Sequence, residues 1–355
     1  MKKRFILYLI LLSLLFTSCS KEAGQQASVS NGEFLLCFLD VGQADSILVS
    51  CDGEHMLIDA GNNQDGDTVV EYLRERKVES LRYAVGTHPH ADHIGGLDTV
   101  LNTIKADTVL LPNKTSNTAT FEDVLDAIDA GGMSVTLAQA GDTYSLGSAS
   151  FEVLSPGKDY GNELNNWSVV IRLTYKEHSF LFTGDAEKEA ERDMLAAGYT
   201  LTADVLKVGH HGSSTSSSME FLTAICPKIA IVQCGTDNDY GHPHAETINR
   251  LQKIGAQIFR TDLNGTIMIT LEGDGLAVSS LSEPGSVIKS DENSSSGMSS
   301  SAVQEEYILN NNSKKFHLPA CSLASKINSR NKGEYRGNRE ELIKQGYSPC
   351  SVCKP

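Results

Sequence analysis

The sequence lacks a hydrophobic segment long enough to cross a membrane. Its longest apolar run, residues 5–16, has 12 residues, whereas a membrane-spanning helix needs about 20. We therefore do not expect a membrane channel. Positive charge is also scarce, because 30 Lys and Arg stand against 45 Asp and Glu, and the formal net charge is −15. An acidic surface disfavours tight nonspecific binding of polyanions, although divalent cations held at a site reverse the local field.

The short apolar run instead predicts a secretory signal peptide. The basic residues Lys2-Lys3-Arg4 precede it, and Thr17-Ser18-Cys19 follows it. A basic start, a short apolar segment and small residues at the cleavage site are the parts of such a peptide. Because a cysteine directly after small residues resembles a bacterial lipobox, we predict that residues 1–18 are removed and that Cys19 is lipidated. Residues 19–32 would then tether an extracytoplasmic, lipid-anchored protein. Ordinary cleavage beside an incidental cysteine is the alternative.

Composition divides the remainder into a long ordered region, a linker and a short tail. From residue 33 to about 281, apolar strand-like runs alternate with helical patterns, an order typical of an α/β fold. Residues 282–313 are rich in Ser and Asn and contain the stretch SSSGMSSS. Such a composition cannot bury enough apolar surface to fold, which predicts a disordered linker. Residues 314–355 are predicted to form a small separate module.

The predicted module contains residues that suit a structural metal ion. His317 and Cys321 are one helical turn apart, and Cys350 and Cys353 form a Cys-x-x-Cys pair. Two thiolates from such a pair, with a His and a Cys from elsewhere, complete the tetrahedral shell that zinc prefers. A segment of about 40 residues rarely folds without such a staple, so we predict one structural zinc ion. A disulfide from Cys321 to Cys350 or Cys353 is the alternative that an exported protein permits.

The densest chemical pattern is the run THPHADHIGG at residues 87–96. It follows the strand-like run 81–85 and places His88, His90, Asp92 and His93 within six residues. Imidazole and carboxylate are the ligands that divalent transition metals prefer. A turn at the end of a strand can aim the first two side chains at one ion and the last two at a second. Because two neighbouring ions form a clamp for hydrolysis, we predict a dinuclear metal centre.

This motif resembles the signature of the metallo-β-lactamase superfamily, and other segments narrow the likeness to one branch. In chain order they are FLDVGQADS (38–46), MLIDAG (56–61), FTGD (182–185), LKVGHHGS (206–213) and YGHP (240–243). Together they are similar to the hydrolase domain of ComEC/Rec2-type competence proteins, which is related to phosphorylcholine esterase. The tail phrases FHLPAC (316–321) and GYSPC (346–350) resemble a small Ada-like metal-binding module. The main resemblance covers about residues 33–280 and implies an αββα sandwich.

The resemblance implies ligands for two divalent ions, zinc or manganese. They are His88 and His90 for the first ion, Asp92 and His93 for the second, Asp185 as a bridge between the ions, and His211 as the last ligand of the second site. His210 is the alternative to His211. A bridging carboxylate and two cations lower the pKa of a shared water, which becomes a nucleophile near neutral pH.

The first ion has fewer expected ligands than the second. The superfamily usually offers another His before the bridging carboxylate, but only His178 lies in that interval, where the pattern predicts an exposed hairpin turn. We therefore expect an incomplete shell for the first ion, or one completed by water or by Asn166. Asn166 belongs to the segment NNWS (165–168), where this branch has a polar motif.

Three residues are candidates for a direct part in catalysis: Asp92, His210 and His242. His242 lies before the helical pattern 245–254 and can give a proton to a leaving oxygen or bind a phosphate; loop packing is the alternative. Asp40 and Asp59 end strand-like runs and are expected to orient the metal ligands, or else to cap turns.

Three functions fit these residues. The first is a surface-anchored phosphodiesterase that attacks extracellular DNA with a metal-bound hydroxide, and the basic tail, with seven Lys or Arg and three Glu from Phe316 onward, favours it. The second is hydrolysis of an anionic wall polymer or another small phosphoester, although choline recognition needs clustered aromatics and the chain has one Trp. The third is a surface protein that binds without catalysis. Expected partners are the substrate polymer, the membrane and a separate DNA-uptake channel.

Overall fold

The computed structural model describes residues 34–280, 288–289, 305–318, 321, 323–337, 342–343 and 345–350. The chain divides into two compact units, Met1–Ser290 and Asp291–Pro355. The predicted signal peptide, the tether, Cys19 and Cys353 lie outside the described residues, so the predictions for them stay predictions. Among the helices that the structure describes, none has the length and the apolar character needed to cross a membrane.

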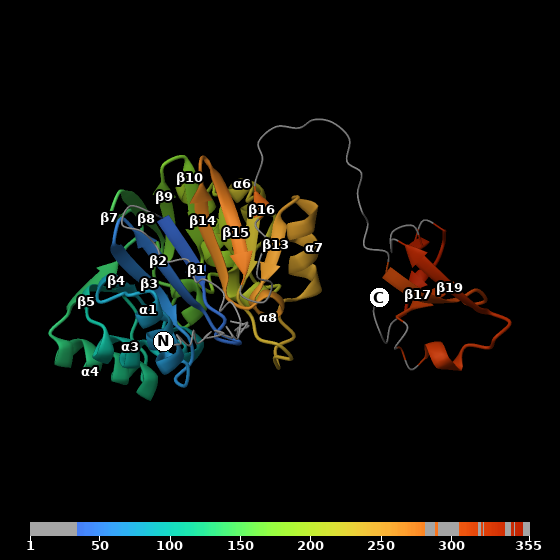
Figure 1. Cartoon of the computed structure of the whole chain (residues 1–355), viewed down its shortest axis with the longest axis horizontal. Coiled ribbons are helices and arrows are strands. Elements are labelled where there is room, and N and C mark those ends of the chain that lie inside the picture. Colours follow the sequence, from blue (N-terminus) through green and yellow to red (C-terminus); the bar gives the residue numbers. More distant parts are fainter. Residues whose placement is uncertain are drawn as a thin grey trace, which may run out of the picture. The chain divides into compact units, whose positions relative to one another are not determined.

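Two β-sheets form the body of the first unit (Figure 1). In the described residues, the first sheet has nine strands in the spatial order β16 (Ile288–Lys289), β15 (Gly275–Ser280), β14 (Ile267–Glu272), β1 (Phe34–Phe38), β2 (Ser46–Cys51), β3 (Glu54–Ala60), β4 (Leu81–Val85), β5 (Ala106–Pro112) and β6 (Ser134–Ala138). The second has seven in the order β13 (Gln257–Arg260), β12 (Ile229–Val232), β11 (Val205–Lys207), β10 (His178–Phe182), β9 (Val170–Tyr175), β8 (Ala149–Ser155) and β7 (Thr143–Leu146).

Helices cover the outer faces of both sheets. The first sheet carries α1 (Gly66–Glu75), α3 (Leu97–Thr103) and α4 (Ala119–Gly131), whose apolar faces share a buried cluster with that sheet. The second sheet carries α5 (Lys188–Ala197), α6 (Met219–Ile225) and α7 (Ala245–Lys253) in the same way. Short helical turns complete the unit: α2 (Ala91–Ile94), α8 (Thr261–Asn264), η1 (Leu164–Trp167) and η2 (Gly209–Gly212).

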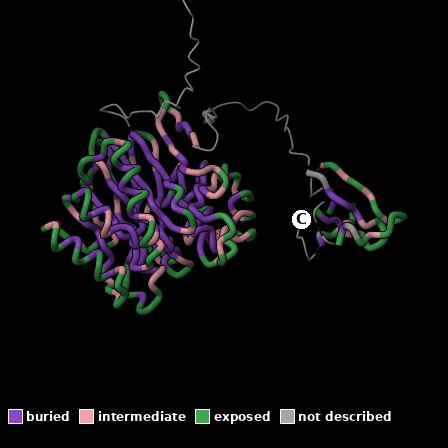
Figure 2. Tube along the Cα trace, turned by 60° about the horizontal axis from the view of Figure 1, so that its bottom comes forward, coloured by how far each residue is buried: buried purple, intermediate pink, exposed green. Residues whose placement is uncertain are grey.

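The alternation of side chains along the strands produces these layers. In β1, Phe34, Leu36 and Phe38 belong to the core between the sheets, whereas Leu35 and Cys37 pack under the helices. Neighbouring side chains of a strand point to opposite faces, and both faces are covered, so the strand is apolar throughout. Figure 2 shows buried segments inside the first unit and exposed segments at its periphery. The αββα sandwich implied by the resemblance is confirmed.

Parallel strands in both sheets place their carboxyl ends at the ligand-bearing connections. In the first sheet β3, β4 and β5 are parallel neighbours, and in the second β10, β11 and β12 are parallel neighbours. The connections after β4, β10 and β11 carry the predicted metal ligands. Carboxyl ends of parallel strands are where α/β proteins usually bind ligands.

The second unit has a four-stranded sheet in the described residues, in the order β19 (Lys332–Gly337), β17 (Glu305–Asn310), β18 (Lys315–His317) and β20 (Ser348–Pro349). A short turn, η3 (Ala324–Lys326), follows β18. The start predicted for this module, residue 314, is wrong, because β17 lies inside the predicted linker and pairs with both β18 and β19. Tyr307 and Leu309 of β17 are buried against Phe316, and this apolar packing explains why a segment in polar surroundings is a strand.

Candidate metal centre

The ligand motif spans the connection from β4 to the short helix α2. His88 and His90 lie in the loop, and Asp92 and His93 lie on the helix. His93 and His88 are buried, with exposed fractions of 0% and 1%. The turn predicted at the end of a strand is therefore present, but its second half is a helical turn and not a loop.

Gly95 and Gly96, which end the motif, let the polypeptide pack closely behind the ligands. A Cβ atom on Gly95 would lie 2.3 Å from the backbone nitrogen of Asn63, and one on Gly96 would lie 2.4 Å from the carbonyl oxygen of Ala60. Side chains do not tolerate such distances, so only glycine allows this approach. The two glycines therefore allow the turn that follows His93 to lie directly against these backbone segments.

Four of the predicted ligands converge on one point. The ligand atoms of Asp92, His93, Asp185 and His211 all lie within 4.8 Å of one another. The Nε2 atom of His93 is 3.2 Å from Asp185 Oδ1. The Nε2 atom of His211 is 3.7 Å from the same oxygen and 3.4 Å from Asp92 Oδ2. These four residues are the set expected for the second ion. The last ligand of that set is His211, as predicted, and not the alternative His210.

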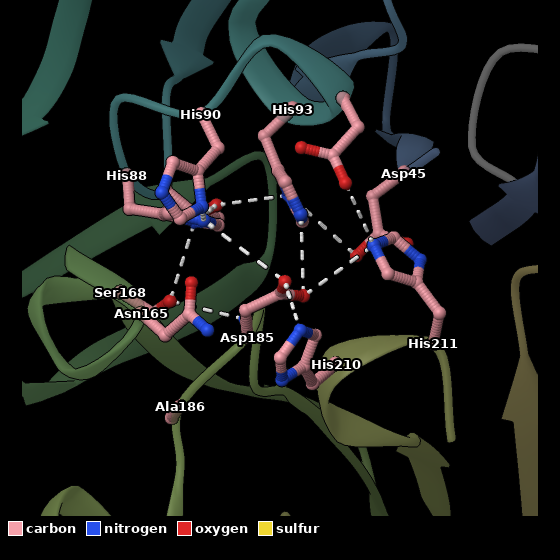
Figure 3. A network of polar contacts seen from close by, with 12 residues as sticks. Asp45, His88, His90, His93, Asn165, Ser168, Asp185, Ala186, His210 and His211 are labelled. Carbon is pink, nitrogen blue, oxygen red and sulfur yellow. Dashed lines mark hydrogen bonds and ion pairs between the residues drawn. The ribbon is translucent and has the colours of Figure 1, made fainter. Parts of the chain in front are cut away.

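The other two ligands of the motif lie across Asp185 from this group (Figure 3). His88 Nε2 is 2.9 Å from His90 Nδ1 and 4.0 Å from Asp185 Oδ2. His210 Nε2 is 3.5 Å from the same Oδ2 atom. One oxygen of Asp185 therefore faces His88 and His210, while the other faces His93 and His211. A carboxylate in this position is able to bridge two cations.

The segment 165–168 holds the bridging residue in place. The backbone N–H of Asp185 donates to Ser168 Oγ over 3.0 Å, and the same hydroxyl lies 3.4 Å from His88 Nδ1. Asn166, which was expected to complete the first site, faces away, because its Oδ1 accepts hydrogen bonds from the N–H groups of Glu187 and Ala190. That expectation is wrong. The neighbouring Asn165 lines the groove at the centre instead.

Hydrogen bonds on the far side of the rings orient the two buried histidines. His93 Nδ1 donates to Asp59 Oδ2 over 2.8 Å, and His211 Nδ1 donates to the carbonyl oxygen of Gln233 over 3.0 Å. Because Nδ1 is occupied in each ring, Nε2 faces the centre. The geometry agrees with the orienting role predicted for Asp59.

Two other predictions made around the centre are wrong. Asp40 does not orient a ligand, because its side chain caps a turn by accepting a hydrogen bond from the N–H of Gly42 over 3.2 Å. His178 does lie at the predicted hairpin between β9 and β10 and is not among the clustered ligand atoms, but the exposure predicted for it is wrong, because its side chain is only 12% exposed. Its Nε2 lies 3.0 Å from the carbonyl oxygen of Asp274, and this contact covers the ring.

A buried ion pair behind the centre was not foreseen from the sequence. Lys207 Nζ lies 2.6 Å from Asp45 Oδ2, and the two side chains are 0% and 2% exposed. The other oxygen of Asp45 lies 3.2 Å from His211 Nδ1, so the pair helps to fix that ring. The available signal was a charged residue inside an apolar run, since Lys207 ends the strand VLK and Asp45 directly precedes the strand SILVSC.

Backbone conformation separates the two adjacent histidines of η2. His210 and His211 both have φ values of 51°, in the left-handed region that residues other than glycine rarely adopt. Each such residue costs about 1 kcal/mol or more. The surrounding structure holds them there, since His210 N donates to Gly184 O and His211 Nδ1 to Gln233 O. In consequence the ring of His210 faces Asp185 Oδ2 and the ring of His211 faces Asp185 Oδ1.

The donor atoms fit divalent cations. His93 Nε2, His211 Nε2 and Asp185 Oδ1 are buried, yet none of them makes a hydrogen bond to any described residue. Burial alone would lower the pKa of His211, but Asp185 and Asp45 raise it to about 10. Burial opposes protonation of His93 as well, and there Asp185 and Asp59 raise the pKa well above its ordinary value. The carboxylates thus favour positive charge at the centre. A metal ion that replaces the ring protons would find ligand atoms there that have no other partner.

His242 lies at the edge of the same groove. Its ring centroid is 5.5 Å from that of His210 and 6.3 Å from that of His211. Burial, together with these neighbouring imidazoles, lowers the pKa of His242 to about 4. Its Nδ1 lies 3.3 Å from Gln43 Nε2, and the other end of that amide accepts a hydrogen bond from Gly235 N over 3.0 Å. Gln43 therefore donates to Nδ1, which leaves the ring proton on Nε2.

The second unit brings three of its four predicted zinc ligands together. The ligand atoms of His317, Cys321 and Cys350 lie within 4.8 Å of one another, and all three residues are buried. Cys321 Sγ is 3.6 Å from His317 Nδ1. The fourth predicted ligand, Cys353, is outside the described residues. Cys321 is a free thiol, so of the two alternative disulfides the one to Cys350 is not formed, and the one to Cys353 lies outside the described residues.

Comparison with known proteins agrees with this centre. A family model described as the metallo-beta-lactamase superfamily matches residues 39–236, more than half of the chain. ComE operon protein 3 of Bacillus subtilis is 32% identical over 247 residues, which cover 64% of this chain and 32% of that protein. Recombination protein 2 of Haemophilus influenzae is 28% identical over 245 residues, with coverages of 68% and 29%. Competence protein ComA of Neisseria gonorrhoeae is 29% identical over 269 residues, with coverages of 75% and 36%. The chain spans about one third of the length of these curated relatives.

Proposed function

The chain belongs to the metallo-beta-lactamase superfamily of metal-dependent hydrolases, and on this premise we propose that it is a phosphodiesterase whose substrate is extracellular nucleic acid. The observation that carries the proposal is the Asp185 carboxylate, whose two oxygens face two separate groups of histidines. Relatives named for competence and recombination support nucleic acid as the substrate class. The predicted lipid on Cys19 would hold the enzyme at the cell surface, which fractionation of producing cells tests.

The centre would use its residues as follows. When bound, two divalent ions activate a water molecule and neutralise charge on the phosphodiester. Asp92, His93 and His211 would hold one ion, His88 and His90 the other, and Asp185 both. His242 stands beside this set as a neutral ring with its proton on Nε2, where it can donate a hydrogen bond to the leaving oxygen of the substrate as negative charge develops there. Gln43 keeps the proton on that side of the ring through its hydrogen bond to Nδ1.

A cleavage assay separates this proposal from the other two functions. The purified chain is incubated with single-stranded DNA, double-stranded DNA and bis(p-nitrophenyl) phosphate, each with Mn²⁺ or Zn²⁺ and each with EDTA. Metal-dependent cutting of DNA supports the nuclease. Cutting of the small diester alone would overturn it in favour of a small phosphoester or a wall polymer. If no phosphodiester is cut, the chain is a binding protein.

Replacement of His242 by Ala is expected to affect substrates according to their leaving groups. For DNA, whose alkoxide leaving oxygen carries concentrated negative charge, loss of the hydrogen bond from Nε2 should lower kcat about 100-fold or more. For bis(p-nitrophenyl) phosphate, whose nitrophenolate leaving group spreads its charge over the ring, the fall is expected to be below about tenfold. Gln43→Met, which cannot donate to Nδ1 and adds no charge, should show the same dependence in weaker form. Steady-state rates with both substrates measure these effects.

His178→Ala is the matched control, because this histidine lies at the β9–β10 hairpin and contacts Asp274 and Asp204 instead of the centre. We expect it to leave both rates unchanged. If His242→Ala lowers both rates equally, the hydrogen bond to the leaving oxygen is wrong and His242 acts on the metal ligands instead.

We also propose that His317, Cys321, Cys350 and Cys353 hold one structural zinc ion. The second unit has only two small apolar clusters in the described residues, which is a weak core for independent folding. Replacing Cys321 by Ser should remove one equivalent of zinc and make this unit sensitive to protease, while cleavage of bis(p-nitrophenyl) phosphate continues. Elemental analysis and limited proteolysis measure the change. An unaltered zinc content would contradict the assignment.

A further inference from the structure

Tyr240 is placed unusually for a large aromatic residue. Its exposed fraction is 67%, the highest among the large hydrophobic side chains that the structure describes as exposed. It lines a groove of about 310 Å³ together with Asp92, Asp185 and His242. An aromatic ring is therefore presented to solvent directly beside the catalytic centre. Single exposed apolar residues are common elsewhere on protein surfaces, so it is this position that requires an explanation.

The loop that carries Tyr240 is held by internal hydrogen bonds. Asn238 Nδ2 donates to the carbonyl oxygens of Gly235 and His242, over 2.8 Å and 2.6 Å. Asn238 Oδ1 accepts from the N–H of His242 over 2.9 Å. Gly241, with a φ of 71°, provides the left-handed residue that closes the turn. The backbone on both sides of the tyrosine is thereby fixed, so its ring is presented by an ordered turn.

The ring of Tyr240 is half of a stack. It lies against the ring of His242 with a centroid distance of 5.6 Å and an interplanar angle of 20°. One face of the tyrosine is therefore used by His242, and its high exposure leaves the other face open. A flat ligand group on the open face of Tyr240 would extend this stack on the side away from His242. The ring of His242 in turn neighbours His210 of the centre.

The groove has little other means of holding a nucleic acid. Among its described lining residues there is no Lys and no Arg, and Tyr240 is the one residue among Phe, Trp and Tyr. A single ring cannot form the aromatic cage that a quaternary ammonium group requires. A nucleobase, in contrast, needs only one flat surface, and base–aromatic stacking is a general device for binding single strands.

We propose that Tyr240 is the stacking platform for the nucleobase next to the scissile phosphate, and that the enzyme consequently prefers single strands, whose bases are free to stack. This inference rests on the proposed function, because it requires a nucleic acid substrate. The phosphate would lie at the metal ligands while the adjoining base covers the open face of Tyr240. Paired bases in a duplex are already stacked on their neighbours and do not reach this surface.

The test compares two single strands that have the same backbone charge, an oligothymidylate and an abasic strand of equal length. Wild type is expected to show a kcat/KM about tenfold to a hundredfold higher for the strand with bases. Tyr240→Ala should reduce this preference to less than about threefold, and Tyr240→Phe should keep it. The ratio matters because any damage to His242 lowers both rates together. Leu263→Ala, which removes a side chain that is 65% exposed outside the groove, is the control and should match wild type.

The outcomes separate this inference from the proposed function. If wild type cuts both strands equally, or if Tyr240→Ala keeps the wild-type preference, the stacking role is wrong while the nuclease stands. If wild type cuts neither strand with any metal, the proposed function falls and the stacking role falls with it.

Discussion

Replacement of Asp185 by Asn is expected to lower the rate of metal-dependent hydrolysis about 1000-fold or more, since two-ion centres supply several kcal/mol of stabilisation. The carboxylate is the only side chain described here that faces both groups of histidines, with Oδ2 3.5 Å from His210 Nε2 and Oδ1 3.2 Å from His93 Nε2. Asn keeps the shape but has neither the charge nor a second acceptor oxygen. Initial rates on bis(p-nitrophenyl) phosphate and the metal content of the purified variant measure the effect.

Asp193→Asn is a matched control for this change. Asp193 contacts Lys158 and Tyr160 on the outside of the second sheet and faces no metal ligand. We expect its activity and metal content to equal those of wild type. An Asp185→Asn variant that keeps more than about a tenth of the wild-type rate would mean that the assigned bridge is not part of the reaction.

Replacement of Lys207 by Met is expected to destabilise the first unit by about 3 to 5 kcal/mol, because it leaves the Asp45 carboxylate buried without its partner. The ammonium group lies 2.6 Å from Asp45 Oδ2 and also donates to the carbonyl oxygen of Val208. Methionine keeps most of the apolar stem, so loss of the charge pair dominates the change. Urea unfolding in EDTA measures it, and the fluorescence of Trp167, the one tryptophan of the chain, reports on this unit.

The double variant Asp45→Asn with Lys207→Met distinguishes a charge effect from a packing effect. It removes both charges, and we expect it to recover at least half of the lost stability. Equal stability of the single and the double variant would show that Lys207 acts through packing and not through the carboxylate. A Lys207→Met variant as stable as wild type would contradict the ion pair altogether.

The sequence predicted the parts of the centre that are local in the chain. His88, His90, Asp92 and His93 could be found because one turn carries them all, and a turn at the end of a buried strand leaves few directions for their side chains. The α/β order of the first unit followed from apolar strand-like runs that alternate with helical patterns along the chain. The places of Asp185 and His211 came from the resemblance, since nothing near them in the chain specifies a metal.

Features that depend on distant segments could not be predicted in this way. The pairing of Asp45 with Lys207 joins the two sheets, and neither residue has a local signal beyond a charge within an apolar run. Asn165 and Asn166 are adjacent, and only the turn of η1 decides which one faces the groove. The strand β17 was assigned to the linker because Ser- and Asn-rich sequence surrounds its short apolar run, Tyr307 to Leu309, whereas its pairing with β18 and β19 is visible only in three dimensions.

The central claim is that Asp185 lies between two metal ions, and anomalous X-ray diffraction from crystals grown with Mn²⁺ tests it most directly. The account predicts two anomalous peaks on opposite sides of the Asp185 carboxylate. One should lie among the side chains of Asp92, His93 and His211, and the other beside His88 and His90. A single peak, or peaks that do not contact Asp185, would contradict the dinuclear centre and the mechanism derived from it.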